Sequence, residues 1–274
     1  MPISVKEINK LREITGVGIM DCKKALLESE GDLEKAIENL RKKGTKVANK
    51  RKDCVANEGY VLGGVDNNGN FGAIVSIFCE TDFVAKNETL QNFVKDVLDI
   101  AIKNKVESLS VLNDIKYNEK ISVNERFIEL IGSLGEKLEL KYTFLSGEKI
   151  GFYNHFNNKI SVLLEVRNYN LEKTDVLKNI AMQIAAMNPI EIKRENVSAD
   201  IVNKELEIAK AQSKEAKTPE IAEKMAKGKL EKFFKENILL EQISIFDNKK
   251  TVLDYIKENG NFEIRKFKSV KTSN

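Results

Sequence analysis

Hydrophobic residues recur at helical spacing over the first 43 residues of the chain. Ser4 and Glu7 form a capping box, which satisfies two backbone donors at the start of a helix. The pattern predicts a first helix from Ser4 to Thr15 and a second from about Met20 to Glu30. A third begins at Asp32 and ends before Gly44. Three short helices close together predict a compact bundle.

The pattern changes to that of strands near Gly59. The runs 60–65 and 71–78 are rich in β-branched and aromatic residues and flank a turn of Asp, Asn and Gly at 66–70, so we expect a hairpin. A helix is expected from about Glu88 to Asn104, and another begins at a second capping box, Ser122 with Glu125. The run 138–145 again predicts a strand.

The hairpin-plus-helix pattern occurs a second time, about 88 residues further along the chain. The runs 150–156 and 160–166 predict the strands, Asn157-Asn158 predicts their turn, and the helix spans 175–187. The repeat predicts an α+β fold whose duplicated core holds two related subdomains of antiparallel hairpins and helices.

A polar helical hairpin is predicted at 199–236. Sixteen of the 34 residues from Asn203 to Glu236 are charged and the apolar stripe is narrow, which favours a pair of helices that projects from the body. A helix at 251–259 and a strand at 262–270 follow. The predicted domains are a bundle with its linker at 1–53, core subdomains at 54–140 and at 141–198 with 237–274, and the hairpin inserted at 199–236.

Composition narrows the choice of chemistry. The chain has 45 basic and 42 acidic residues, one histidine and no tryptophan, and its three cysteines form no C-x-x-C pair. We therefore expect reduced thiols and no bound metal or cofactor. The sequence also lacks a G-x-x-x-x-G-K-[ST] phosphate loop, so we expect no nucleotide bound by the chain itself. No run resembles a signal peptide or a membrane span, so we expect a soluble cytoplasmic protein without a membrane partner.

A basic run lies at 41–52, where seven of twelve residues are Lys or Arg. It is open to two interpretations, a contact with RNA or the ribosome and a solvated linker or helix with a basic face. The second is favoured, because the net charge of only +3 produces no strong overall field.

Candidate catalytic residues are few. Cys22 lies beside Lys23 at the start of a helix, where a thiol can become reactive, but a packed small side chain is the favoured interpretation. His155 stands among aromatic residues in the second hairpin, which favours a structural or interface role. We expect a protein that is not an enzyme.

The connector after the first hairpin carries Thr81, Asp82, Phe83 and Val84. Phe83 is either a core plug under the following helix or an exposed wedge, a rigid aromatic beside a charge. From the residues alone the plug is favoured.

Two long motifs resemble signatures of the elongation factor Ts family. They are 11–26 (LREITGVGIMDCKKAL) and 81–87 (TDFVAKN), with shorter matches at 151–155, 180–186 and 220–225. The resemblance covers the chain in the right order. It implies a guanine-nucleotide exchange factor for elongation factor Tu, with an N-terminal domain like the ubiquitin-associated domain, and it favours the wedge over the plug.

The resemblance also implies a set of partner-binding residues. In this family the N-terminal domain contacts the nucleotide domain of elongation factor Tu, and the wedge approaches the magnesium and phosphate site. The partner would be bound both with GDP and free of nucleotide, nucleic acid is not expected, and a homodimer stays open. The residues implied are Val17, Ile19, Met20, Asp21 and Lys23, then Thr81, Asp82, Phe83 and Val84, and finally His155.

Overall fold

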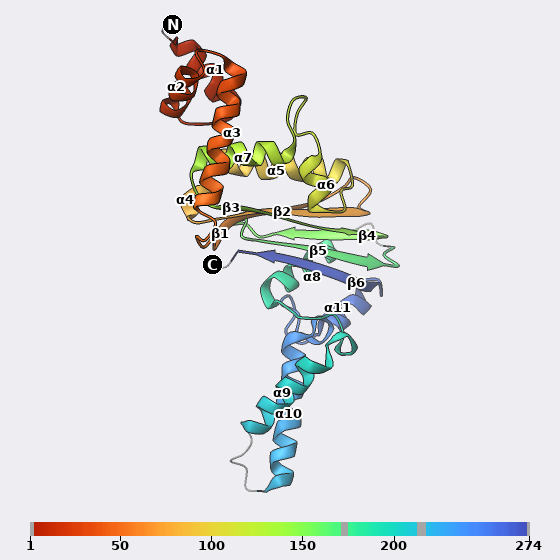
Figure 1. The fold of residues 1–274 in the computed structure, drawn as a ribbon. Coiled ribbons are helices and arrows are strands. Elements are labelled where there is room, and N and C mark those ends of the chain that lie inside the picture. The colour runs from red at the N-terminus through yellow and green to blue at the C-terminus, as the bar shows by residue number, and fades with distance from the viewer. Residues whose placement is uncertain (1–2, 171–174, 213–217, 273–274) are drawn as a thin grey trace. The chain divides into compact units, whose positions relative to one another are not determined.

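The computed structural model describes residues 3–170, 175–212 and 218–272, and it confirms the predicted α+β fold (Figure 1). The described chain divides into two compact units. Unit 1 comprises the described residues of Met1–Phe144, Asn154–Ser161 and Val270–Asn274, and unit 2 those of Leu145–Tyr153 and Val162–Ser269. Unit 1 is thus assembled from three separate segments of the chain. The finer division into four domains stays a prediction.

Unit 1 begins with the predicted bundle, formed by α1 (Val5–Thr15), α2 (Ile19–Glu28) and α3 (Leu33–Lys50). The capping box is present: the Glu7 carboxylate accepts from the Ser4 amide at 2.8 Å, and the Glu7 amide donates to the Ser4 hydroxyl at 3.2 Å. Gly16 ends α1 with a φ of +70°, a conformation that glycine adopts without strain.

The third helix does not end before Gly44, as the sequence pattern predicted, but continues to Lys50. The extension packs along α7 (Val123–Leu134), where a Cβ on Gly44 would lie 2.4 Å from the Ile128 carbonyl oxygen. Gly132 of α7 faces Gly44 across this contact, since a Cβ added to Gly132 would lie 3.1 Å from the Gly44 Cα. The two glycines allow the helix backbones to approach closely, and this contact joins the bundle to the rest of unit 1.

Ion pairs reinforce the contact between α3 and α7. Glu129 of α7 is buried and accepts from Arg41 Nε at 2.8 Å and from Arg126 Nη1 at 3.1 Å. Arg126 also donates to the carbonyl oxygen of Thr15, at the end of α1, at 3.3 Å. A buried carboxylate needs such partners, because an unpaired buried charge is strongly destabilising.

The basic run 41–52 is therefore mostly helix rather than linker. Four of its seven basic side chains have acidic partners. These pairs are Arg41 with Glu125 and Glu129, Lys42 with Glu38, Lys43 with Asp21, and Arg51 with Glu80. The pairing lowers the positive charge available to a nucleic acid and weakens that interpretation.

The first sheet has the strand order β1-β2-β3, with β1 at Glu58–Val65, β2 at Phe71–Cys79 and β3 at Leu138–Ser146. Strands β1 and β2 form the predicted hairpin, with Glu58 opposite Cys79. The one-turn helix α4 (Asp82–Ala85) leads into α5 (Glu88–Lys103), which packs on β1 and β2, and the short α6 (Leu109–Asp114) precedes α7. All nine residues of β2 are buried.

The second sheet has the order β4-β5-β6, with β4 at Lys149–Asn154, β5 at Ile160–Arg167 and β6 at Glu263–Lys271. Helix α8 (Asp175–Met187) follows β5, so the repeated hairpin and helix are both present. Further short elements are the 3-10 helices η1 (Arg194–Asn196) and η2 (Leu239–Glu241) and helix α11 (Val252–Glu258). Strand β4 ends at Asn154, so Phe156 belongs to the turn and not to a strand.

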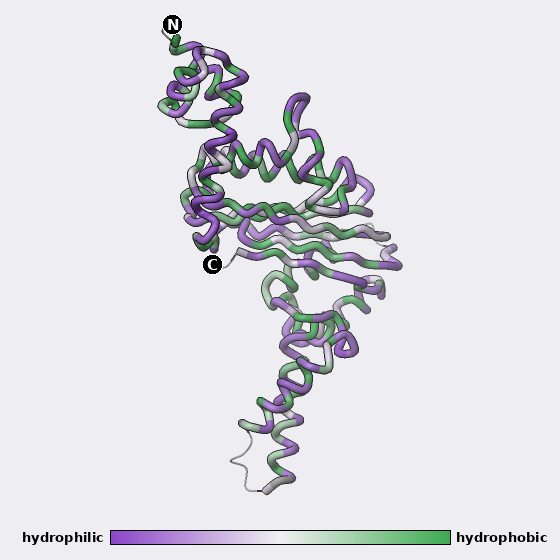
Figure 2. Tube along the Cα trace, in the orientation of Figure 1, coloured by the Kyte–Doolittle hydropathy of each residue, from purple (hydrophilic) through white to green (hydrophobic). Residues whose placement is uncertain are grey.

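The predicted helical hairpin consists of α9 (Ala199–Ala211) and α10 (Pro219–Asn237), and residues 213–217 between them lie outside the described residues. Figure 2 shows hydrophilic and hydrophobic positions alternating along both helices. Their base belongs to the core of unit 2. Arg194 donates to Glu231 at 2.8 and 2.9 Å and also to Glu241, and a buried cluster contains Val197, Phe234 and Ile238.

We expect that the distal part of the hairpin can be removed without loss of the fold. Replacing residues 205–228 with a short Gly-Ser turn keeps Arg194, Glu231 and Phe234, so thermal unfolding measured by circular dichroism should stay cooperative. Replacing all of 199–236 also removes Phe234, and losing a buried Phe side chain costs about 3–5 kcal/mol. Equal melting temperatures for the two deletions would contradict this role of the base.

Candidate partner-binding site

Phe83 lies on the one-turn helix α4 and exposes 82% of its surface. The interpretation of this residue as a core plug is therefore wrong. Ala85, two residues further on, is the buried residue of the turn and packs into the core cluster with Cys79 and Leu90. The buried Ala85 fixes one side of α4, and Phe83 is left on the outside.

Hydrogen bonds from a distant loop hold this turn in place. The Thr81 hydroxyl caps α4, accepting from the Val84 amide at 3.4 Å. The Glu136 carboxylate, just before β3, accepts from the Thr81 hydroxyl at 2.7 Å and from the Thr81 amide at 3.1 Å. These three hydrogen bonds restrain the backbone and side chain of Thr81 and give the turn a defined conformation.

Glu80 anchors the start of the same turn. Its carboxylate accepts from Arg51 Nη1 at 2.8 Å and from the Lys137 amide at 2.6 Å. The backbone hydrogen bond from Lys137 lowers the pKa of Glu80, with Arg51 adding to the effect, so this carboxylate stays ionised at neutral pH.

A charge pair stands beside the exposed aromatic. The Asp82 carboxylate accepts from Lys86 Nζ at 2.7 Å, and this hydrogen bond lowers the pKa of Asp82. Asp82 and Lys86 lie one helical turn apart, and both reach solvent. The tip of α4 therefore presents a hydrophobic ring next to an ionised carboxylate.

The N-terminal candidates are divided between surface and core. Met20 is 75% exposed, Ile19 and Lys23 are also exposed, and Asp21 pairs with Lys43 at 2.6 Å. Val17 is only 3% exposed. Its side chain packs in the buried cluster of the bundle, because the chain must turn tightly between α1 and α2, so it offers no side-chain surface to a partner.

Cys22 is fully buried in the same cluster. Its Sγ donates to the Val17 carbonyl oxygen at 3.4 Å, and burial raises the pKa of the thiol. A protonated thiol without access to solvent is a poor nucleophile. This geometry contradicts the alternative of a thiol enzyme centred on Cys22.

His155 is half-buried in the turn between β4 and β5, with its ring centroid 4.4 Å from that of Phe156. Phe156 itself is 87% exposed, although it is not among the candidates predicted from the sequence. The available signal was its place directly before Asn157-Asn158, since an apolar side chain in a hairpin turn lies beyond the sheet face that would bury it.

The structure brings α4 and the 155–159 turn together. A pocket of about 260 Å³ is lined by residues of both, including Asp82, Ala85, Lys86 and Phe156, with Tyr60 of β1. Asp82 and the turn that carries His155 are therefore neighbours, although 73 residues separate them in the sequence.

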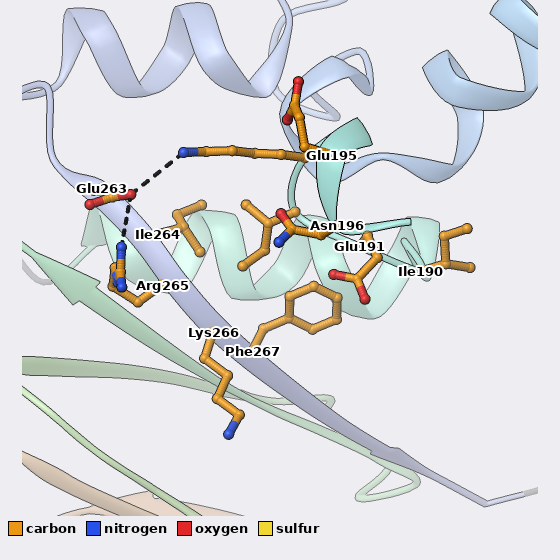
Figure 3. A pocket seen from close by; sticks show the side chains of 11 residues that line it. Ile190, Glu191, Glu195, Asn196, Glu263, Ile264, Arg265, Lys266 and Phe267 are labelled. Carbon is orange, nitrogen blue, oxygen red and sulfur yellow. Dashed lines mark hydrogen bonds and ion pairs between the residues drawn. The ribbon is translucent and has the colours of Figure 1, made fainter. Parts of the chain in front are cut away.

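A larger pocket of about 680 Å³ lies within unit 2, between residues 190–196 and β6 (Figure 3). Three of the charged residues in its lining form ion pairs: Glu263 accepts from Lys193 at 3.5 Å and from Arg265 at 3.2 Å. The hydrogen bond from Arg265 lowers the pKa of Glu263, so the carboxylate stays ionised and is a poor general acid.

No three His, Cys, Asp or Glu side chains among residues 3–170, 175–212 and 218–272 come together in a way that would hold a metal ion. Over the same ranges no helix has the length and apolar character needed to cross a membrane.

Comparison with known proteins gives a consistent result. Residues 80–274 match the family described as Elongation factor TS. The chain is 41% identical to Elongation factor Ts of Amoebophilus asiaticus, with 98% of this chain and 99% of that protein covered. It is 42% identical to the proteins of the same name from Christiangramia forsetii, with 98% of both chains covered, and from Flavobacterium psychrophilum, with 97% of both covered.

Proposed function

This chain belongs to the elongation factor Ts family of translation elongation factors, and on that premise we propose how it acts. The proposal is that it binds elongation factor Tu, with GDP bound or without nucleotide, and promotes release of GDP in the cytoplasm. The observation that carries the proposal is Phe83, an aromatic side chain held almost fully exposed on a rigid turn.

The wedge would act at the magnesium and phosphate site of the partner. Phe83 would insert between the elements that hold the phosphates, and the ionised Asp82 beside it would repel negative charge there. Because Glu80 and Glu136 already fix the turn, little conformational entropy is lost when the wedge is inserted.

Exchange of this kind is a coupling between two binding equilibria. The factor binds the nucleotide-free partner more tightly than the GDP-bound one. By reciprocity, GDP must lower the affinity of the partner for the factor as much as the factor lowers its affinity for GDP. A thousandfold decrease in the affinity for GDP corresponds to a coupling free energy of about 4 kcal/mol. Burying one Phe side chain gives about 1.5–3 kcal/mol, so Phe83 alone is not sufficient.

The remaining coupling would come from the N-terminal bundle. Ile19 and Met20 are exposed at the start of α2, next to Asp21 and Lys23, and they form a mixed apolar and charged surface. The contact of α3 with α7 carries this surface on the same compact unit as Phe83. No chemical step by the chain itself is needed for this activity.

Release of labelled GDP from purified elongation factor Tu, measured with and without the chain, tests the proposal. We expect release to accelerate with increasing concentration of the chain, and we expect added GDP to weaken the complex by the same coupling factor. Release at the spontaneous rate in the presence of saturating chain would rule the proposal out.

A further inference from the structure

We infer that Phe156 is a second aromatic contact for elongation factor Tu, in the wall of the pocket that its turn shares with α4. The inference rests on the proposed function and extends it to a surface outside the wedge. Among the described residues Phe156 and Phe83 are the two most exposed large hydrophobic side chains, at 87% and 82%. Phe156 lines the pocket directly, and Phe83 lies between the pocket residues Asp82 and Ala85 in the sequence.

The turn that carries Phe156 is closed by its own backbone. The His155 amide donates to the Ile160 carbonyl oxygen at 2.9 Å, and the Asn158 amide donates to the His155 carbonyl oxygen at 2.8 Å. Asn158 has a φ of +52°, a conformation that asparagine tolerates better than most residues. The ring of Phe156 is thus displayed on a turn with a defined shape.

The same turn is bonded to β1. The side-chain amide of Asn154 forms two hydrogen bonds with the backbone of Gly63. Its Nδ2 donates to the Gly63 carbonyl oxygen at 2.8 Å, and its Oδ1 accepts from the Gly63 amide at 2.9 Å. The Val61 amide donates to the Asn158 carbonyl oxygen at 2.7 Å. Since β1 pairs with β2, which leads into α4, both aromatic tips are anchored to one hairpin. A surface that is rigid beforehand binds a partner at a lower entropic cost.

The pocket suits an apolar side chain of the partner. Its charged residues form pairs, Lys159 with Glu58 at 3.0 Å and Lys86 with Asp82 at 2.7 Å, so neither sign of charge is in excess. Ala85, Tyr60 and the ring of Phe156 supply apolar surface. We therefore assign the pocket to a hydrophobic side chain of elongation factor Tu that is buried when the wedge engages.

The test is the affinity of the full-length Phe156→Ala chain for nucleotide-free elongation factor Tu. We expect binding about tenfold weaker, as for the loss of an aromatic anchor at an interface. Phe156→Leu should retain most of the affinity, because it preserves the apolar bulk. Val111→Ala, at an exposed hydrophobic position on α6 that does not line the pocket, is the matched control and should bind as the wild-type chain does.

Unchanged affinity of Phe156→Ala, with unchanged melting temperature, would overturn the inference. If the affinity is unchanged and sedimentation shows that the substitution dissociates a dimer, the occupant of the pocket is a second copy of the chain and the inference is equally wrong. Affinity is measured separately from GDP release so that failure of the proposed function can be distinguished from failure of this inference. A wild-type chain that binds without accelerating release defeats the proposed function, whereas the Phe156→Ala affinity still decides this inference.

Discussion

Phe83→Ala should slow the factor-stimulated release of GDP tenfold or more, while the melting temperature stays close to that of the wild-type chain. A tenfold loss corresponds to about 1.4 kcal/mol of coupling, which is within what one buried Phe side chain supplies. Because Phe83 is 82% exposed in the free protein, its truncation removes almost no packing. Surface substitutions of this kind change stability by about 0.5 kcal/mol or less.

Two measurements on one variant separate the possible outcomes. Stopped-flow release of labelled GDP reports the coupling, and circular dichroism reports the melting temperature. Val111→Ala, which truncates an exposed side chain on α6, serves as the control for nonspecific loss of surface and should leave both quantities unchanged. A fall of several degrees in the melting temperature of Phe83→Ala, with normal release, would contradict the wedge.

Gly44→Ala should destabilise the protein by about 1–3 kcal/mol, the typical cost of overpacking a close contact. The new Cβ would lie 2.4 Å from the Ile128 carbonyl oxygen, which belongs to the backbone and cannot rotate away. Helices α3 and α7 would have to separate. The expected fall in melting temperature is about 2–4 °C for each kcal/mol, and the displaced bundle should also weaken binding to elongation factor Tu.

Gly228→Ala in α10 is the matched control for this substitution. Nothing lies within 4 Å of a Cβ at Gly228, so only the helix propensity changes there. That change favours alanine by about 0.8–1 kcal/mol, so the control should be neutral or more stable. If Gly44→Ala also stabilises the protein, the close contact of α3 with α7 does not restrain the bundle.

Local signals predicted the starts of elements well. The capping boxes at Ser4 and Ser122 open α1 and α7, because each cap is complete within four residues of the chain. The two hairpins were predictable for a similar reason, since their turn residues and flanking strands are adjacent in the sequence.

The end of α3 was not predictable from local pattern. The low helix propensity of glycine suggests that a helix ends at Gly44. In the structure α3 continues through Gly44, because it packs against α7 and only a glycine allows α7 to approach so closely. The signal for this lies at Gly132, 88 residues away. Tertiary packing overrules propensity at such positions.

The exposure of Phe83 was equally hidden from the residues around it. An aromatic between two core elements is usually buried. Here Ala85 is the residue of the turn that packs into the core, and Glu136 holds the turn from a distant part of the chain. The resemblance to the elongation factor Ts family did favour the exposed position. Val17 shows the converse, since a residue in a signature motif packs in the core.

The three-segment construction of unit 1 has a consequence for biosynthesis. The Lys159 carbonyl oxygen, in the turn beside Phe156, accepts from the Thr272 amide at 3.0 Å. Roughly 130 residues separate the end of the first segment from Thr272, and at about 5–20 residues per second their translation takes roughly 6–26 s. During that interval the ribosome holds a nascent chain whose bundle and first hairpin can already fold. The turn that displays Phe156 therefore receives this backbone hydrogen bond only after residue 272 has been translated, long after the turn itself.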